Sequence, residues 1–234
     1  MDRLPNLRIL SAGAPKTGVR LCAEAFASAT MGTVEIEFAT APEVRERMAS
    51  GFVDADIVVA PVAAIEEFAA SGALIVGSSV LLGSISAGVA VRRGAQVPDL
   101  HSAASLREAL LTADLLIYNR ASSGQYIHTM IERLGLSEAV AGKTLRTDTG
   151  ADAMAYLAND RSERAIGFGQ ITEIRLKEGL GIQLVGPLPE ELGKKTSYSA
   201  AVSTSARNPD RAKDLLAHFT SEEGRGILLQ SGIE

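Results

Sequence analysis

Short apolar segments alternate with amphipathic helical segments along the first seventy residues. Strict alternation places Val34, Ile36 and Phe38 on one face of a predicted strand. Pro42 suits the first turn of a helix, because its missing N–H has no partner there. The predicted strands are 7–10, 33–39 and 56–60, and the predicted helices are 17–31, 42–50 and 63–71. This strand–helix rhythm predicts parallel strands with crossover helices, and therefore an α/β fold.

Two long segments rich in small residues, Ser84–Arg92 and Ser197–Ser205, predict strands that run between two lobes. The other expected elements are strands at 115–119, 165–169 and 182–185 and helices at 102–113, 125–134, 151–159, 208–220 and 222–230. We therefore expect a discontinuous first lobe, residues 1–84 and 198–234, and a continuous second lobe, residues 85–197. The hinge is expected near 84–88 and 195–200, with a cleft between the two α/β lobes.

Composition excludes several classes of protein. Lys and Arg total 23 and Asp and Glu 28, so the formal net charge of −5 does not fit a protein held to nucleic acid by charge. Aromatic residues make up 4%, and tryptophan is absent, which disfavours a stacking platform for bases. A single cysteine, Cys22, excludes an internal disulfide, and we expect it to be a small buried apolar residue. We expect a monomer without metal or cofactor.

The sequence does not locate the protein in the cell. No apolar run reaches the ~18 residues of a membrane span, and the first residues lack the pattern of a secretory signal. We expect a periplasmic protein if a signal peptide was removed from this chain, and a cytoplasmic protein otherwise.

Four small, polar strand-to-helix turns are the candidate site. They are Ser11–Lys16, Thr40–Pro42, Arg120–Gly124 and Thr147–Gly150. Ligands of open parallel sheets bind beyond the carboxyl ends of the strands, where helix N-termini carry about half a positive charge. The hydroxyls of Thr40, Ser122, Ser123 and Thr149 are candidate donors, and Lys16 and Arg120 add full charges suited to an anion. The alternative is that the hydroxyls only cap helices and that both cations are surface residues.

Common catalytic motifs are missing. No Walker-type phosphate loop or Gly-x-Ser-x-Gly elbow occurs. His128 has the chemistry of a base, but we expect a satisfied or exposed helix histidine. Glu43, Glu46 and Glu173 fall at predicted helix starts or exposed faces and indicate no glycosidase pair.

Several segments together resemble the type II periplasmic binding proteins, in particular the molybdate-binding proteins. They are Leu7–Ala14 (LRILSAGA), Glu35–Pro42 (EIEFATAP), Asp54–Ala60 (DADIVVA), Tyr118–Tyr126 (YNRASSGQY), Ile166–Ile174 (IGFGQITEI) and Leu184–Pro189 (LVGPLP). The resemblance covers nearly the whole chain. It implies a two-lobed type II periplasmic-binding-protein fold, with mixed or parallel sheets flanked by helices. It also implies a clamp that closes on an oxyanion and presents it to an ABC-type membrane transporter.

By position, the resemblance assigns ligand contacts to Ala14, Thr40 or Ala41, Ser123, Gly150 and Phe168. The full set of expected ligand-binding residues is Ser11, Ala14, Lys16, Thr40, Ala41, Arg120, Ser122, Ser123, Thr149, Gly150, Phe168 and Gln170. Molybdate binders usually have serine where Ala14 stands and tyrosine where Phe168 stands. With both hydroxyls missing and two cations nearby, we expect an organic carboxylate rather than molybdate.

Three functions remain open at this point. The first is a solute-binding protein without chemistry. The second is an isomerase of small unsaturated polycarboxylates, because a branch of the family resembles aconitate isomerase; Lys16 would then be the candidate base. The third is a cytosolic anion sensor built on the same clamp.

Overall fold

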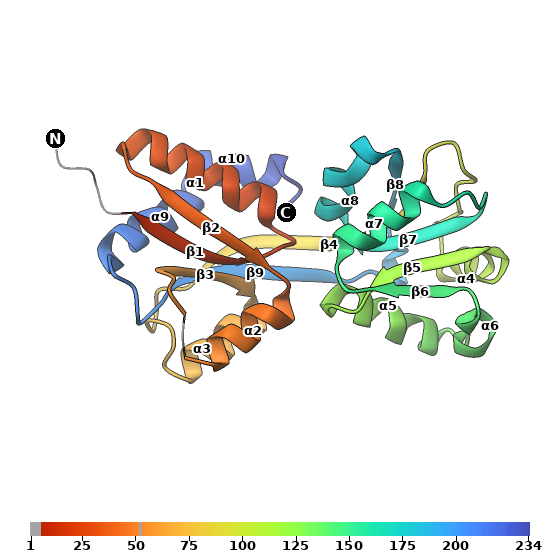
Figure 1. The fold of residues 1–234 in the computed structure, drawn as a ribbon, viewed down its shortest axis with the longest axis horizontal. Coiled ribbons are helices and arrows are strands. Elements are labelled where there is room, and N and C mark those ends of the chain that lie inside the picture. Colours follow the sequence, from red (N-terminus) through yellow and green to blue (C-terminus); the bar gives the residue numbers. More distant parts are fainter. Residues whose placement is uncertain (1–5, 52) are drawn as a thin grey trace. The chain divides into compact units, whose positions relative to one another are not determined.

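The computed structural model describes residues 6–51 and 53–234 of the chain. The chain forms two compact units (Figure 1). Unit 1 comprises Met1–Ile85 and Thr196–Glu234, and unit 2 comprises Ser86–Lys195. The chain passes from one unit to the other within two strands, β4 (Val80–Arg92) and β9 (Lys195–Val202).

Unit 1 is built on a mixed sheet. Its strands are β1 (Leu7–Ala12), β2 (Val34–Ala39), β3 (Ile57–Pro61) and the unit 1 parts of β4 and β9, in the order β2-β1-β3-β9-β4. β1 runs parallel to both β2 and β3, whereas β9 runs antiparallel to β3. The carboxyl ends of β1, β2 and β3 therefore lie at one edge of the sheet.

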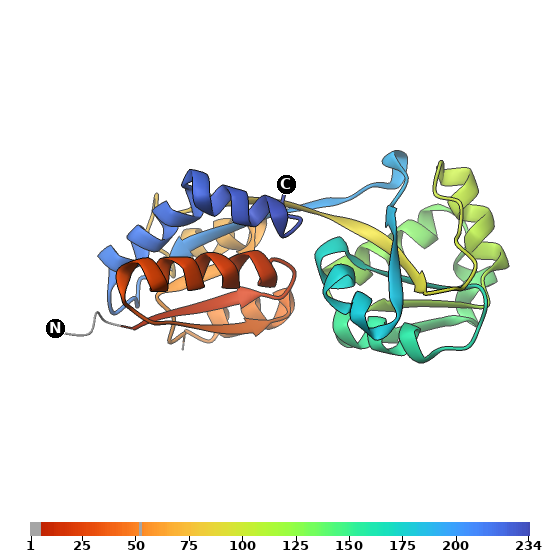
Figure 2. The same ribbon diagram turned by 90° about the horizontal axis from the view of Figure 1, so that it is seen from above.

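Helices cover both faces of the unit 1 sheet (Figures 1 and 2). α1 (Lys16–Thr30), α9 (Pro209–Thr220) and α10 (Glu222–Gln230) pack on one face, and α2 (Ala41–Ala49) and α3 (Val62–Ala70) on the other. Cys22 lies fully buried in the first of these layers, which confirms its predicted packing role. Burial, and then the charge of Glu223, raise the pKa of the Cys22 thiol to about 12.

Unit 2 also has a mixed sheet. Its strands are the unit 2 part of β4, β5 (Leu115–Asn119), β6 (Thr144–Thr147), β7 (Ala165–Gln170) and β8 (Ile182–Pro187). The order is β4-β7-β5-β6, and β8 pairs with β4. β5 is parallel to β6 and β7, so their carboxyl ends share one edge, while β4 is antiparallel to β7 and β8.

The helices of unit 2 form two layers around this sheet. α4 (Ala103–Thr112), α5 (Ser122–Arg133) and α6 (Ser137–Ala141) share one core with Tyr118 and Phe168. α7 (Gly150–Asn159) and α8 (Ile171–Lys177) share the other core with Ile117 and Ala165. Two 3-10 turns, η1 (Glu178–Leu180) and η2 (Glu190–Leu192), precede and follow β8.

The α/β class and the mixed sheets flanked by helices are confirmed. Five short elements among the described residues were not predicted: α6, β6, α8 and the 3-10 turns η1 and η2. β1 extends to Ala12, so Ser11 lies inside the strand rather than in the following turn. Among the described residues, no helix combines the length and apolar character that a membrane crossing needs.

Candidate functional site

In unit 1, three of the expected residues lie between the end of β1 and the start of α1. Ser11 is fully buried, and its hydroxyl donates to the carbonyl oxygen of Ala12 at 2.9 Å. Ala14 is also buried. Lys16 begins α1, and its ammonium lies 5.1 Å from the centre of the Phe38 ring. Of the three side chains, that of Lys16 offers a charge to an anion at this edge.

The start of α2 holds Thr40 and Ala41 in a capping box. The Thr40 hydroxyl accepts from the backbone N–H of Glu43, and the Thr40 N–H donates to the Glu43 carboxylate at 2.6 Å. The hydrogen bond from the Thr40 backbone N–H lowers the pKa of Glu43 below its usual value, and the Thr40 side chain contributes a smaller lowering. The Thr40 hydroxyl therefore has a structural role at this terminus, and Ala41 is the first residue of the helix.

In unit 2, Asn119 at the end of β5 organises the start of α5. Its side chain is 2% exposed; Nδ2 donates to the Ser123 hydroxyl at 3.1 Å, and Oδ1 accepts from the Gly124 N–H at 3.2 Å. Ser122, the first residue of the helix, is exposed. Arg120 is exposed as well, and its Nη1 donates to the carbonyl oxygen of Arg146 at 2.9 Å. The guanidinium must leave this contact, or share it, to bind a ligand.

The first residues of α7 lie beside the Asn119 side chain. The Thr149 hydroxyl caps the helix by accepting from the backbone N–H of Asp152 at 3.1 Å. Gly150 follows it, and a Cβ added there would lie 2.3 Å from Oε2 of Glu173 and 3.2 Å from Nδ2 of Asn119. The carboxyl of Glu173 and the amide of Asn119 therefore both pack against Gly150.

β7 ends at Gln170, which is 5% exposed. Its Oε1 is buried and accepts no hydrogen bond from any described residue. Two residues earlier, Phe168 is 1% exposed and lies in the hydrophobic core with Tyr118, so its side chain fills space within unit 2. Of these two expected ligand contacts, only Gln170 lies at the carboxyl edge of the unit 2 sheet.

Glu173 is a residue that the sequence reasoning set aside. It is the third residue of α8, it is only partly exposed, and its carboxyl lies against Gly150. Burial raises its pKa, while a hydrogen bond from the Gln170 N–H works in the opposite direction. The sequence places Glu173 only at a helix start or an exposed face, and it gives no sign of the contact with Gly150.

His128 does not face an open site. Its Nδ1 lies 3.3 Å from the Tyr118 hydroxyl, and its Nε2 lies 3.5 Å from Glu132. These contacts fit the satisfied helix histidine expected from the sequence. Among the residues that the structure describes, no group of three or more His, Cys, Asp or Glu side chains could hold a metal ion.

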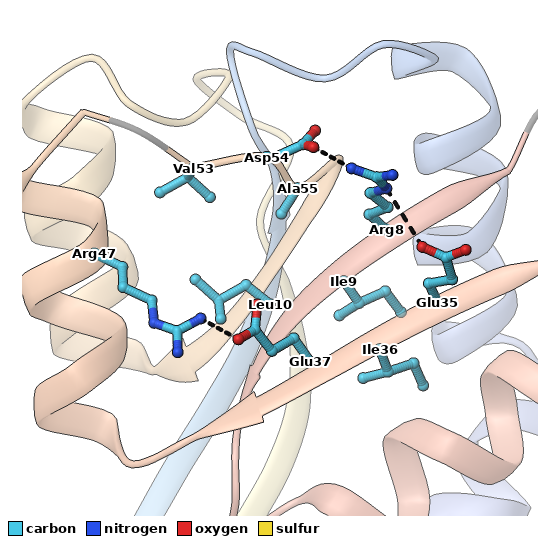
Figure 3. Close-up of a pocket in the computed structure, with 10 residues that line it drawn as sticks. All are labelled: Arg8, Ile9, Leu10, Glu35, Ile36, Glu37, Arg47, Val53, Asp54 and Ala55. Atoms are coloured by element: carbon cyan, nitrogen blue, oxygen red, sulfur yellow. Dashed lines mark hydrogen bonds and ion pairs between the residues drawn. The ribbon is translucent and has the colours of Figure 1, made fainter.

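A pocket of about 470 Å³ lies elsewhere in unit 1 (Figure 3). It lies along the amino-terminal halves of β1 and β2, with α2 and the segment before β3 around it. Its charged lining residues are Arg8, Glu35, Glu37, Arg47 and Asp54. Arg8 pairs with Glu35 at 3.4 Å and with Asp54, and Arg47 pairs with Glu37. Two arginines against three carboxylates leave this pocket unsuited to an anion.

Comparison with known proteins supplies independent information. A family model described as bacterial extracellular solute-binding protein matches residues 7–234. An aconitate isomerase from Pseudomonas sp. is 30% identical over 237 residues, covering 98% of this chain and 87% of the relative. The Azotobacter vinelandii periplasmic molybdate-binding protein superposes with a TM-score of 0.77 at 14% identity, covering 97% of this chain and 98% of the other. A sulfate-binding protein from Mycobacterium tuberculosis also gives 0.77 at 14% identity, covering 98% and 86%.

Proposed function

Since this chain belongs to the bacterial extracellular solute-binding protein family, we propose that it binds a small organic anion with two or more carboxylates. The observation that carries the proposal is the buried Gln170 amide at the carboxyl edge of the unit 2 sheet: its oxygen has no partner among the described residues, and the amide turned over presents its NH₂ group as a donor to a carboxylate. A buried polar atom without a partner is costly unless something else satisfies it. The aconitate isomerase relative favours a polycarboxylate as the ligand class.

Two expected cations are assigned to the same ligand. Lys16 at the start of α1 and Arg120 before α5 supply the positive charge that two or more carboxylates require. We propose that the two units close on the ligand by a hinge in the residues 84–88 and 195–200. The bound form would then dock on an ABC-type permease, as expected for the family.

A thermal-shift screen tests the ligand class. The purified chain is heated with molybdate, sulfate, phosphate and a panel of di- and tricarboxylates including cis-aconitate, trans-aconitate and tricarballylate. A ligand at one hundred times its dissociation constant adds about 2.7 kcal/mol to the folded state. We expect tricarboxylates to raise the melting temperature. Stabilisation by molybdate or sulfate alone would overturn the proposal.

A substitution of Arg120 provides a second test of the proposed ligand. Arg120→Ala is expected to weaken tricarboxylate binding by about 1.5–3 kcal/mol, the range of a hydrogen bond to a charged group. Arg161→Ala, at an exposed arginine between α7 and β7, is the matched control and should leave the affinity unchanged. Equal affinities for both variants and the unmodified chain would remove Arg120 from the site.

A second candidate function is isomerisation of an unsaturated tricarboxylate, favoured by the 30% identical aconitate isomerase. In such a reaction a base removes a proton from the saturated CH₂ carbon of aconitate. The C–H electron pair forms a new double bond, and the original double bond takes up a proton at its far carbon. Proton NMR of cis-aconitate with the chain in deuterated water would reveal interconversion or deuterium uptake. Loss of that turnover in Lys16→Ala, with tricarballylate binding retained, would assign the base to Lys16; a tight complex without turnover would leave the binding protein.

A further inference from the structure

Five residues of unit 2, far apart in the sequence, form one polar group at the carboxyl edge of the sheet. We call it the edge cluster; its members are Asn119, Ser123, Gly150, Gln170 and Glu173. The Asn119 amide bonds to Ser123 and lies near Gly150, and the Glu173 carboxyl lies against Gly150. The backbone N–H of Gln170 donates to Glu173. Asn119, Ser123 and Glu173 therefore contribute side chains to the cluster, and Gln170 contributes its backbone N–H.

The Gln170 side chain projects from the face of β7 that packs with α5, whereas its backbone N–H bonds to Glu173. Side chains alternate along a strand, so Gln170 shares a face of β7 with Ile166 and Phe168, which pack in one core with α5. α5 starts at this same edge of the sheet, directly after β5. The unpaired Oε1 of Gln170 is thus a buried polar position beside the first turn of α5. Rotation of the amide can present either an acceptor or a donor there.

Among the residues that the structure describes, no arginine, lysine or histidine contributes to the pKa shift of Glu173. Charged residues on the elements packed against it are Asp152 on α7 and Glu178 on η1, together with Arg175 and Lys177 on α8 itself. Asp152 is engaged by Thr149, and Glu178 accepts from the backbone N–H of Leu184. The shift in the Glu173 pKa is caused by burial and by the Gln170 N–H, without a contribution from any of these charges. Glu173 therefore resists ionisation more than an exposed glutamate does.

We propose that Glu173 couples ligand binding to a proton: as the neutral acid, it donates its O–H to a carboxylate oxygen of the ligand. This inference rests on the proposed polycarboxylate ligand. The carboxyl group has two oxygens, and the one bond from the Gln170 N–H leaves the other free to carry the proton. An O–H···O⁻ bond is among the stronger hydrogen bonds in proteins, whereas an ionised Glu173 would repel the same ligand.

Coupling to a proton makes the affinity for the ligand depend on pH. A ligand that binds only when Glu173 is protonated loses up to about tenfold in affinity for each pH unit above the pKa of Glu173 in the free protein. Glu173→Gln keeps an acceptor for the Gln170 N–H and a permanent donor for the ligand. The affinity of this variant should therefore fall less with rising pH than that of the unmodified chain.

Titration calorimetry with tricarballylate tests this directly. Tricarballylate is saturated and has no double bond to move, so binding is separated from turnover. The enthalpy is measured at one pH in two buffers of different ionisation enthalpy, PIPES and Tris, which yields the number of protons taken up. We expect the unmodified chain to take up as much as one proton more per ligand than Glu173→Gln. The subtraction removes the protons that belong to the ligand itself.

Glu138→Gln is the matched control, because it makes the same change at an exposed position in the first turn of α6. It should take up protons as the unmodified chain does. Equal proton uptake in the unmodified chain and in Glu173→Gln would overturn the inference while leaving polycarboxylate binding intact. Absence of tricarballylate binding in the unmodified chain would instead remove the proposed function, and this inference with it.

A second measurement avoids the substitution altogether, in case Glu173→Gln does not fold. The side-chain carboxyl carbons of ¹³C-labelled glutamates are followed by NMR as the pH is varied, with and without tricarballylate. We expect one glutamate to titrate above the others and to move higher still when the ligand is bound. Glutamates that all titrate unchanged on adding a saturating amount of tricarballylate would contradict the proton coupling.

Discussion

Glu173 is a side chain whose chemistry is set by its neighbours rather than by its residue type. Burial raises its pKa in the folded state, so protons bind the folded chain more tightly than the unfolded one. Its contribution to stability is therefore present below the unfolded pKa of about 4.3 and is lost as pH rises through the folded pKa. We expect Glu173→Gln to be more stable than the unmodified chain at pH 8, with the difference shrinking toward pH 4. Urea unfolding at both pH values checks this, and an equal difference at the two would contradict it.

Gly124 is a position where only a residue without Cβ fits. A Cβ there would lie 1.7 Å from the backbone oxygen of Asn119, and backbone atoms cannot move aside cheaply. We expect Gly124→Ala to cost more than about 2 kcal/mol. Gly142→Ala is the control, because nothing lies within 4 Å of its added Cβ and its φ of −71° is ordinary. Chemical denaturation measures both; equal midpoints would refute the packing of β5 against α5.

Two helix-capping hydroxyls, one beside the edge cluster and one distant from it in the sequence, allow capping to be separated from ligand binding. Thr149 caps α7 beside the edge cluster, and Ser102 caps α4 by a capping box with Ser105. Loss of either hydroxyl should cost about 1 kcal/mol of stability. Thr149→Ala should in addition weaken tricarballylate binding, because Gly150 follows it directly, whereas Ser102→Ala should not. Thermal melts and titrations of both variants make the comparison, and unchanged binding in Thr149→Ala would limit Thr149 to its cap.

The alternation of apolar strands and amphipathic helices was enough to predict the α/β class and most elements. The missed elements lack that signal: β6 is four partly buried residues (TLRT), α6 is five residues, and α8 follows β7 without any intervening turn. Ser123, Gly150 and Gln170 are among the expected ligand-binding residues: Ser123 and Gly150 belong to polar turns before predicted helices and match the family by position, and Gln170 follows the predicted strand 165–169. Asn119 and Glu173 were not among the expected site residues, because both contact Gly150, which is distant from each of them in the sequence, and local patterns do not record such contacts.

The passage of β4 and β9 between the units bears on how the protein would respond to its ligand. If the residues 84–88 and 195–200 act as a hinge, ligand binding should draw the units together, with small backbone changes at few positions. Small-angle X-ray scattering is expected to give a smaller radius of gyration with saturating tricarballylate than without it. An unchanged radius of gyration at full occupancy would contradict hinge closure.

The central claim is that this member of the solute-binding family takes a polycarboxylate rather than an inorganic oxyanion. Calorimetric titration of the unmodified chain with cis-aconitate, tricarballylate and molybdate, at one pH and ionic strength, tests it most directly. The account predicts one site per chain, with a dissociation constant below about 100 μM for a tricarboxylate and at least about tenfold weaker binding of molybdate, a difference of about 1.4 kcal/mol. Micromolar binding of molybdate without measurable binding of either tricarboxylate would contradict it.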